Sequence, residues 1–309
     1  MFPFPKIEKL NFVAPLGMCF HDAATGERII DGLSVSIYPV TKSIYKQRTT
    51  ALPNRSGVYV LHYAYPLEDF SRGAGDAEFW AANPPQKLFV AEVVDQENRF
   101  QTFQFTLKLP VKGIYRWENI PSTSPNKNLS SIPLYSAPAR KVTGGMSVIR
   151  AELRQNQAKS ASWAVLEARF NGNLIARGIA DREGQILLIF PALSPQNNPL
   201  ISPPSNATRI SLADQKWMLD LTVKYEPNIF QTSPSFSTEN EAEVSPDLRL
   251  VLAQSNGRLW ANAEKTEVLT TAVLQLGREL ILRSHAAQIL SPMPISKTAF
   301  SSYLFVSPA

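Results

Sequence analysis

The chain has 309 residues, of which 44% are hydrophobic and 18% charged, a balance typical of a globular protein and not of a disordered one. Its formal net charge is +5, but the basic residues are interleaved with acidic ones, so we expect a solvated surface and no nucleic-acid partner. The longest apolar run, residues 186–193, contains Pro191 and is too short to cross a bilayer, which argues against direct transmembrane insertion.

The single cysteine, Cys19, cannot form a disulfide within the chain, and the first residues lack the basic start and apolar run of a secretory signal. Both features lead us to expect a cytoplasmic protein. With 24 prolines against 14 glycines, the chain is also expected to have long loops and little helix, because proline removes a backbone donor.

The first third of the chain predicts strands that alternate with turns. Leu33 and Val35 share one face at a period of two, as do Phe103 and Phe105, which predicts strands with one buried face. Further strands are expected over 17–21, 58–63, 87–94 and 100–109. Residues 68–82 allow at most a short helix after Gly73 and Gly75. We assign residues 1–118 to a first antiparallel β-sandwich.

Residues 119–139 are rich in Ser, Pro and Asn and predict a linker. A second series of strands follows over 147–153, 162–170, 174–180, 185–190 and 216–225. Gly172 and Gly184 lie in the turns between them, where hairpins require a positive φ. We assign residues 140–228 to a second β-sandwich. Its predicted inward-facing residues are Trp163, Val165, Leu219 and Leu221.

The rest of the chain predicts proline-rich arms and a C-terminal segment. The spans 191–208 and 231–246, the second within a linker at 229–246, are expected to be contact arms. Strands are predicted over 248–253, 258–261, 267–276 and 279–283, with turns at Asn256-Gly257 and Gly277. We expect residues 247–309 to form a β-hairpin segment that packs on the second sandwich or on a neighbouring subunit. Its buried contact residues are predicted to be Leu250, Leu252, Leu274 and Leu276.

The residues that catalysis or metal binding would need do not occur in a recognisable pattern. The three histidines, His21, His62 and His285, stand outside any motif. We expect His62 to be an ordinary strand residue and Asp22 to start a turn and not to orient His21 as a base. There is no HExxH and no CxxC. The sequence therefore predicts no catalytic residue, no cofactor and no metal site.

Three further features have a structural interpretation that we prefer to a functional one. Gly144-Gly145 is not followed by a phosphate-loop motif and is expected to be a hinge. Asp95 and Glu97 are expected to be solvated turn residues and not a hydrolytic pair. The five tryptophans, at 80, 117, 163, 217 and 260, are expected to be core residues and not a sugar-binding platform.

Both strand series resemble the carboxypeptidase-regulatory-like, or transthyretin-like, β-sandwich domain. The first reads FHDAATGERIIDGLSVSIYP followed by NRSGVYVLHY, and the second reads VLEARFNGNLIARGIADREGQILLIFP. The second keeps the acidic residue before its last glycine, in Asp181-Arg182-Glu183-Gly184, whereas the first has Asn54-Arg55-Ser56-Gly57. This resemblance implies tandem antiparallel β-sandwiches joined by Pro/Ser-rich arms.

A broader resemblance rests on stretches such as FVAEVVDQENRFQTFQFTLKLP, IPLYSAPARKV and LQLGRELILRS. With the stretches above, they are similar to proteins that accompany bacterial clusters for phage-tail-like contractile injection systems. The resemblance implies a non-catalytic structural component, associated with the baseplate, whose partners are baseplate, sheath or spike subunits. No single residue fixes its place in such a particle.

Two other functions stay open at this point. The same fold and the supply of aromatic residues suit a carbohydrate- or surface-binding adhesion module. A divergent enzyme with a transthyretin-like accessory domain is the weakest alternative, because the two sandwiches leave no span for a separate catalytic domain.

Overall fold

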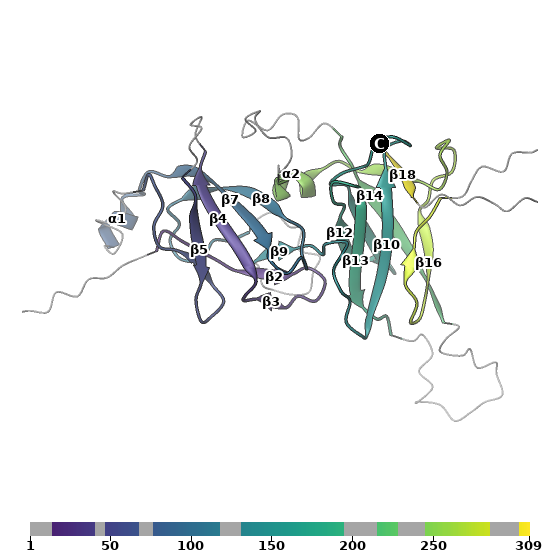
Figure 1. Ribbon diagram of the computed structural model, residues 1–309, viewed down its shortest axis with the longest axis horizontal. Helices are drawn as coiled ribbons and strands as arrows, with labels where there is room; N and C mark the ends of the chain where they lie inside the picture. The colour runs from purple at the N-terminus through teal and green to yellow at the C-terminus, as the bar shows by residue number, and fades with distance from the viewer. Residues whose placement is uncertain are drawn as a thin grey trace, which may run out of the picture.

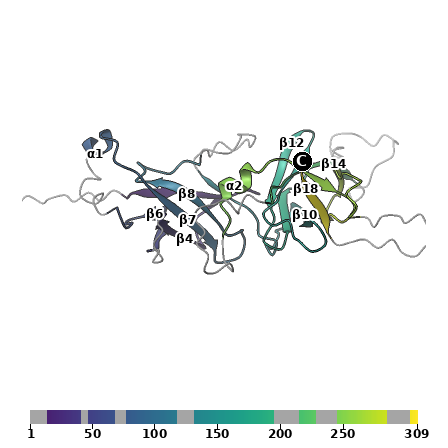
Figure 2. The ribbon, with the colours of Figure 1, turned by 90° about the horizontal axis from the view of Figure 1, so that it is seen from above.

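The computed structural model describes residues 14–40, 47–67, 77–117, 131–194, 215–227, 245–284 and 303–309. It is an all-β protein, as the alternating sequence patterns predict, with two β-sandwiches arranged end to end along the long axis of the molecule (Figure 1). The short helix α2 lies between them in both views (Figures 1 and 2). The described part of the chain has no helix that is both long and apolar enough to cross a membrane.

The first sandwich packs a six-stranded sheet on a three-stranded one. The large sheet has the order β1 (Leu16–Met18), β6 (Tyr59–Leu61), β5 (Thr49–Pro53), β4 (Leu33–Pro39), β7 (Lys87–Asp95) and β8 (Phe103–Leu109). The small sheet has the order β3 (Arg28–Ile29), β2 (Phe20–Asp22) and β9 (Ile132–Leu134). Phe20 of the small sheet meets Tyr59 of the large one edge to face, with ring centroids 5.2 Å apart. The short helix α1 (Ala77–Ala81) confirms the predicted short helix.

The predicted linker 119–139 is wrong for its last part. Residues 132–136 are buried, and β9 pairs in parallel with β2, so that Phe20 lies opposite Ile132. Tyr135 then accepts a backbone bond from Gln101 at 2.9 Å. Proline and serine made this stretch look like a linker, but short buried edge pairing tolerates Pro133. Residues 118–130 lie outside the described part.

The second sandwich packs two sheets around a separate core. One sheet has the order β13 (Gln185–Pro191), β10 (Met146–Arg154), β18 (Leu304–Pro308) and β15 (Gly257–Trp260), with β17 (Leu280–Ile281) also paired to β10. The other has the order β12 (Asn173–Ile179), β11 (Val165–Phe170), β14 (Lys216–Lys224) and β16 (Thr271–Gln275). Trp217 is the largest side chain that is fully buried between them.

The described residues of the segment 247–309 do not form a hairpin unit of their own, which corrects the prediction. β16 pairs with β14, β15 pairs with β18, and β17 and β18 pair in parallel with β10. The C-terminal strands are thus shared between both sheets of the second sandwich, and Leu274 is buried in its core while Leu276 packs against it. Sequence spacing alone predicts neighbours along the chain, whereas these strands take partners far away in sequence.

The predicted strand 248–253 is also wrong, because α2 (Leu248–Ala253) is a helix. Asp247 caps it: its side chain accepts the backbone N–H of Arg249 at 2.9 Å. Leu248 and Val251 lie three residues apart and are both buried in the core of the first sandwich. The run LRLVLA fits a period of two as well as a helical one, so only the cap distinguishes the two structures.

Most of the predicted inward-facing residues are confirmed. Six of them are buried in the core of their own sandwich: Leu33, Val35, Phe103, Phe105, Leu219 and Leu221. Val165 is buried too, but in the core of the first sandwich. Trp163 is only half-buried, because the chain turns there with φ at 63° and β11 begins two residues later. Leu250 and Leu252 of α2 are half-buried as well. Of the predicted arms, residues 195–208 and 231–244 lie outside the described part, while Pro191 ends β13 and Ser245 and Pro246 are buried.

Candidate functional site: the junction between the two sandwiches

The junction is built on the outer face of the β12–β11 sheet. Val165 and Ile179 lie opposite each other on these strands, and both belong to the hydrophobic core of the first sandwich and not to that of their own. Burying two β-branched side chains against a neighbouring domain contributes about 1.5–3 kcal/mol for each. The two sandwiches therefore share one apolar core at this point, which corrects the prediction that Val165 faces the second core.

Helix α2 packs against this junction, called the seam below, and contacts both sandwiches. Leu248 and Val251 enter the first core, and the guanidinium of Arg249 lies over the ring of Trp117 at 5.1 Å and over that of Tyr115 at 6.0 Å. Arg249 also donates to the Tyr115 hydroxyl. Ahead of the helix, Pro246 accepts a backbone bond from Gln104 of β8 at 2.9 Å. The start of α2 is in this way bonded to the first sandwich.

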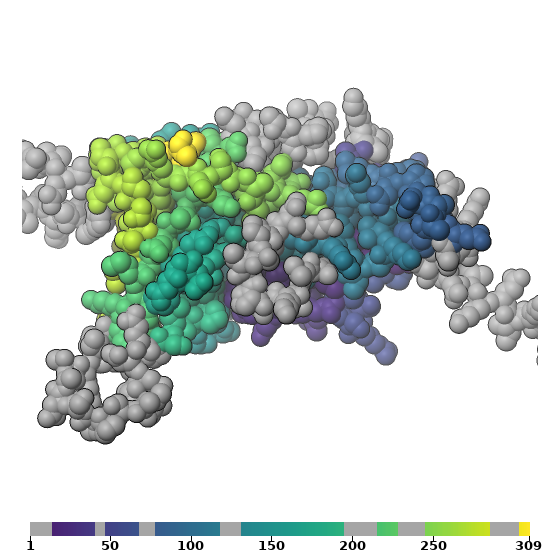
Figure 3. Space-filling view, turned by 180° about the vertical axis from the view of Figure 1, so that it is seen from behind, coloured from purple at the N-terminus to yellow at the C-terminus, as the bar shows by residue number. Residues whose placement is uncertain are grey.

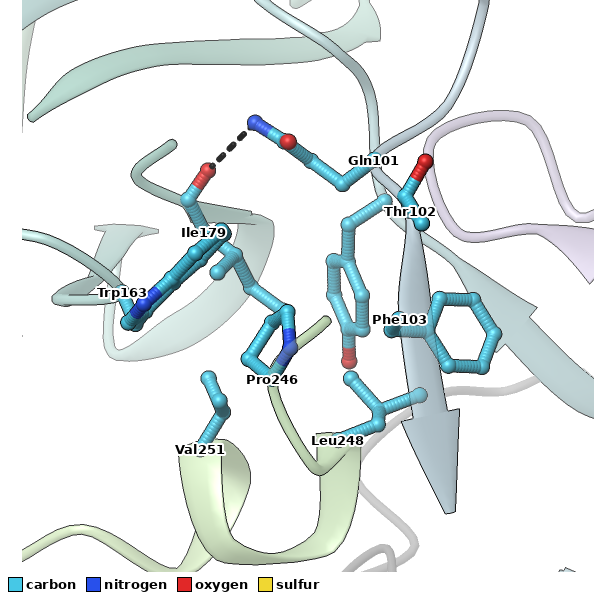
Figure 4. Close-up of a pocket in the computed structure, with 9 residues that line it drawn as sticks. Gln101, Thr102, Phe103, Trp163, Ile179, Pro246, Leu248 and Val251 are labelled. Atoms are coloured by element: carbon cyan, nitrogen blue, oxygen red, sulfur yellow. Dashed lines mark hydrogen bonds between the residues drawn. The ribbon is translucent and has the colours of Figure 1, made fainter. Parts of the chain in front are cut away.

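The end of α2 is bonded to the second sandwich through Gln254. Its side-chain amide donates to the carbonyl of Trp163 at 2.8 Å, and its side-chain oxygen accepts the backbone N–H of Glu226 at 2.9 Å. Gln254 is 3% exposed, so these partners replace water. Across the seam, the amide of Gln101 donates to the carbonyl of Ile179 at 3.4 Å, as the dashed line in Figure 4 shows.

A small pocket lies in the seam, lined by apolar side chains from both sandwiches and from α2 (Figure 4). Its walls include Phe103, Tyr135, Trp163, Ile179, Leu248 and Val251. Gln101 and Thr102 add neutral polar groups. The lining contains no Asp, Glu, His, Lys or Arg side chain, so the chemistry that it offers is mainly apolar contact.

A buried carboxylate of the second sandwich is held by three cations. Glu167 of β11 pairs with Arg177 at 2.7 Å, Arg169 at 3.1 Å and Lys224 at 3.8 Å. Burial alone would raise the pKa of Glu167, but the charge of Arg177 and the other basic groups outweighs it and lowers that pKa below 4.5.

The same cluster reaches across the junction through Tyr135, which follows β9. Arg177 donates a side-chain hydrogen bond to the Tyr135 hydroxyl. Complete burial raises the pKa of Tyr135, so the group stays a neutral phenol. In addition, Arg150 of β10 donates to the carbonyl of Pro138, which follows β9, at 2.6 Å. Polar contacts therefore bracket the apolar seam on several sides.

Asp22 and His21, which were considered as catalytic candidates, contact groups that hold a turn and a strand end in place. Asp22 accepts the backbone N–H of Ala24 at 2.8 Å, which confirms that it starts a turn, and it pairs with Arg140 at 2.5 Å. His21 lies 2.9 Å from the Ser131 hydroxyl, and burial lowers its pKa despite the opposing charge of Asp22. His62 is exposed just after β6, and His285 lies outside the described part.

Asp95 and Glu97 differ in exposure. Asp95 is not solvated as predicted: it is 4% exposed and accepts the backbone N–H groups of Arg99 and Phe100, the latter at 3.1 Å. Glu97 is exposed. Within the described ranges, no three His, Cys, Asp or Glu side chains gather as metal ligands would.

None of the five tryptophans is exposed. Trp117 and Trp217 are buried, whereas Trp80, Trp163 and Trp260 are half-buried. The indole N–H of Trp260 donates to Ser307 at 3.0 Å. These side chains do not form a flat aromatic platform of the kind that stacks on sugars.

The junction is not predicted from the sequence, because its residues come from many separate stretches of chain. One signal was available: Asp247 precedes an apolar run that is also compatible with helical spacing, which is a helix start. The charges around Glu167 gave no such signal, since Arg177 and Lys224 meet it only across neighbouring strands.

Comparison with known proteins adds little to this geometry. No protein-family model matches the chain, and no curated protein does. Among solved structures, the Bacillus anthracis TIE protein matches 84% of this chain and 43% of its own, with 8% identity and a TM-score of 0.20. The C-terminal fragment of the pilus adhesin SpaC from Lactobacillus rhamnosus GG matches 94% of this chain and 96% of its own, with 8% identity and a TM-score of 0.17. The chain thus spans less than half of the TIE protein.

Proposed function

We propose that this chain is a non-catalytic structural component of a bacterial contractile injection system or phage-tail-like particle, acting at the baseplate through protein–protein contacts. The observation that carries the proposal is the bonded junction. A subunit that transmits force within a particle has to keep its domains at a fixed angle, whereas ordinary interfaces between domains of one chain permit relative motion. Here α2 is bonded to both sandwiches, through Arg249 at one end and Gln254 at the other.

The type of particle in this proposal comes from the sequence resemblance. The exposed surface offers side chains that can bind its other subunits. Several large apolar side chains are exposed on the sheets, among them Leu52, Leu88, Met218 and Val273. In this proposal the protein assembles in the cytoplasm with baseplate, sheath or spike subunits and uses such surfaces to bind them.

The test is made in the bacterium that carries the gene. Particles are purified from a strain with a tagged copy and from a strain in which the gene is deleted. We expect the tagged chain to sediment with sheath and tube proteins, and particles from the deletion strain to lack complete baseplates. A chain that is found only free, while particles of the deletion strain are intact, would refute the proposal.

The alternative is a carbohydrate- or surface-binding module. The exposed Tyr63 and Tyr65 next to β6 are the observation in its favour. It predicts that the isolated protein binds cell-surface glycans and that replacing both tyrosines with alanine removes this binding. A particle component predicts no glycan binding and normal assembly of the same double variant.

A further inference from the structure

Strand β16 is an open sheet edge. Leu221 donates to Thr270 at 2.7 Å and Leu276 donates to Gln215 at 3.1 Å at the two ends of its pairing with β14. Hydrogen-bonded and non-hydrogen-bonded residue pairs alternate along an antiparallel pair of strands. Between these two ends, the backbone groups of Ala272 and Leu274 therefore form the hydrogen bonds to β14. The backbone groups of Thr271 and Val273 therefore point away from β14, and no described residue bonds to them there.

Most other sheet edges in the described ranges are covered. Gln104 of β8 bonds to Pro246, Tyr115 bonds to Gly17 of β1, and Gln101 bonds to Tyr135 next to β9. The β12 edge is covered by β13, which lies so close that a Cβ on Gly178 would be 3.0 Å from the carbonyl oxygen of Leu187. β16 also lacks the usual protection of an edge strand: TAVLQ has no charge, proline or bulge.

The outer face of β16 carries an apolar stripe that continues onto β14. Val273 lies opposite Met218, and this is a non-hydrogen-bonded pair, in which side chains approach most closely. Val273 is 50% exposed and Met218 is 65% exposed. The stripe has Lys216 on one side, opposite Gln275, and Asp220 on the other, opposite Thr271.

We propose that β16 pairs antiparallel with β16 of a second copy of this chain, about a two-fold axis at Val273. The two Val273 residues then exchange both backbone bonds, and the four-stranded sheets join into one continuous sheet. The symmetry makes the surface self-complementary, because it extends the Met218–Val273 stripe across the axis. It also places Lys216 of one copy in the same row as Asp220 of the other, about three strand spacings away, so that the pairing brings no like charges together. Strand β16 lies at the end of the molecule away from the first sandwich (Figure 1). The view from behind shows the same two sandwiches (Figure 3). The pairing concerns the isolated chain and does not depend on the particle assignment.

The test measures the mass of the purified full chain by sedimentation velocity at concentrations up to about 100 μM. We expect a species of twice the 34.3 kDa of one chain. Val273→Lys places two like charges opposite each other and should raise the dissociation constant at least about tenfold. Leu52→Lys, at a similarly exposed strand position of the first sandwich, should leave it unchanged. Circular dichroism spectra equal to that of wild type, taken at a concentration where wild type is monomeric, show that both variants fold.

A cross-link gives the register. In a hydrogen-bonded antiparallel pair the Cα atoms are about 5.5 Å apart, which suits a disulfide, so Val273→Cys should form covalent dimers on mild oxidation. Met218→Cys is the matched control, because the two β14 strands would lie three strand spacings, about 14 Å, apart. A monomeric wild type, or cross-linking of Met218→Cys alone, overturns the proposal. If the wild type is monomeric and the Val273→Lys variant also fails to join particles, the edge instead pairs with a strand of another protein.

Discussion

The side-chain amide of Gln254 donates to the carbonyl of Trp163 at 2.8 Å, and this single contact ties the end of α2 to the start of β11. Trp163 has a positive φ of 63°, so its carbonyl is turned out of the regular sheet and needs a partner from elsewhere. The same Gln254 side chain accepts the N–H of Glu226.

Replacing Gln254 with alanine should therefore lower the free energy of unfolding by about 1–3 kcal/mol, because a buried carbonyl and a buried N–H lose their partners. Chemical denaturation of the variant measures the loss. Ser255→Ala, one residue further at an exposed side chain, is the control and should change the free energy by less than about 0.5 kcal/mol. Equal effects of the two substitutions would contradict the role of Gln254.

The Glu167 cluster predicts a specific dependence of stability on pH. The pKa of Glu167 is lowered in the folded protein, so its ion pairs contribute fully above its ordinary value of 4.5 and are lost as the pH falls through the folded-state pKa. Glu167→Gln should cost more than about 1 kcal/mol at pH 7, since it leaves Arg177 without its carboxylate. The difference from wild type should shrink towards pH 3. Glu264→Gln, at an exposed carboxylate, is the control and should change the free energy of unfolding at pH 7 by less than about 0.5 kcal/mol.

Two turn glycines with similar positive φ values should respond differently to alanine. Gly172 and Gly184 have φ values of 79° and 83°, so alanine costs about 1–2 kcal/mol at either position. At Gly184 the new Cβ would also lie 2.2 Å from the carbonyl oxygen of Leu153, whereas at Gly172 nothing lies within 4 Å. Thermal denaturation should show Gly184→Ala to be the less stable by at least about 2 kcal/mol. Similar melting temperatures would argue against this close approach.

A chain that ends at Pro246 should lose the second sandwich. It lacks α2 and the strands β15 to β18, and with them core residues of the second sandwich such as Leu259, Leu274 and Val306. We expect near-ultraviolet circular dichroism to show loss of the fixed environment of Trp217, which these strands cover. A truncated chain that keeps a cooperative transition within a few degrees of wild type would mean that residues 247–309 are dispensable for the core.

The sequence alone predicted the strands whose alternation is clear, such as β4, β8 and β14, and the positive-φ turns at Gly172 and Gly184, because both depend on neighbouring residues only. The hairpin predicted at Gly184 is wrong, since β12 and β13 on either side of it belong to different sheets. It also predicted two sandwiches. It failed where one short run fits two structures, as in α2, where the cap by Asp247 decided for helix. It failed equally where composition misled, as at Pro133 in the buried strand β9.

The junction and the open edge were decided by tertiary structure. Val165 and Ile179 look like ordinary core residues of their own domain, and only the packing of the sandwiches assigns them to the first core. Likewise, nothing in TAVLQ shows that β16 has a partner on one side only. The sequence sets which faces of a strand are apolar, because side chains alternate along it, but partners distant in the chain are chosen by the free energy of the whole packed molecule.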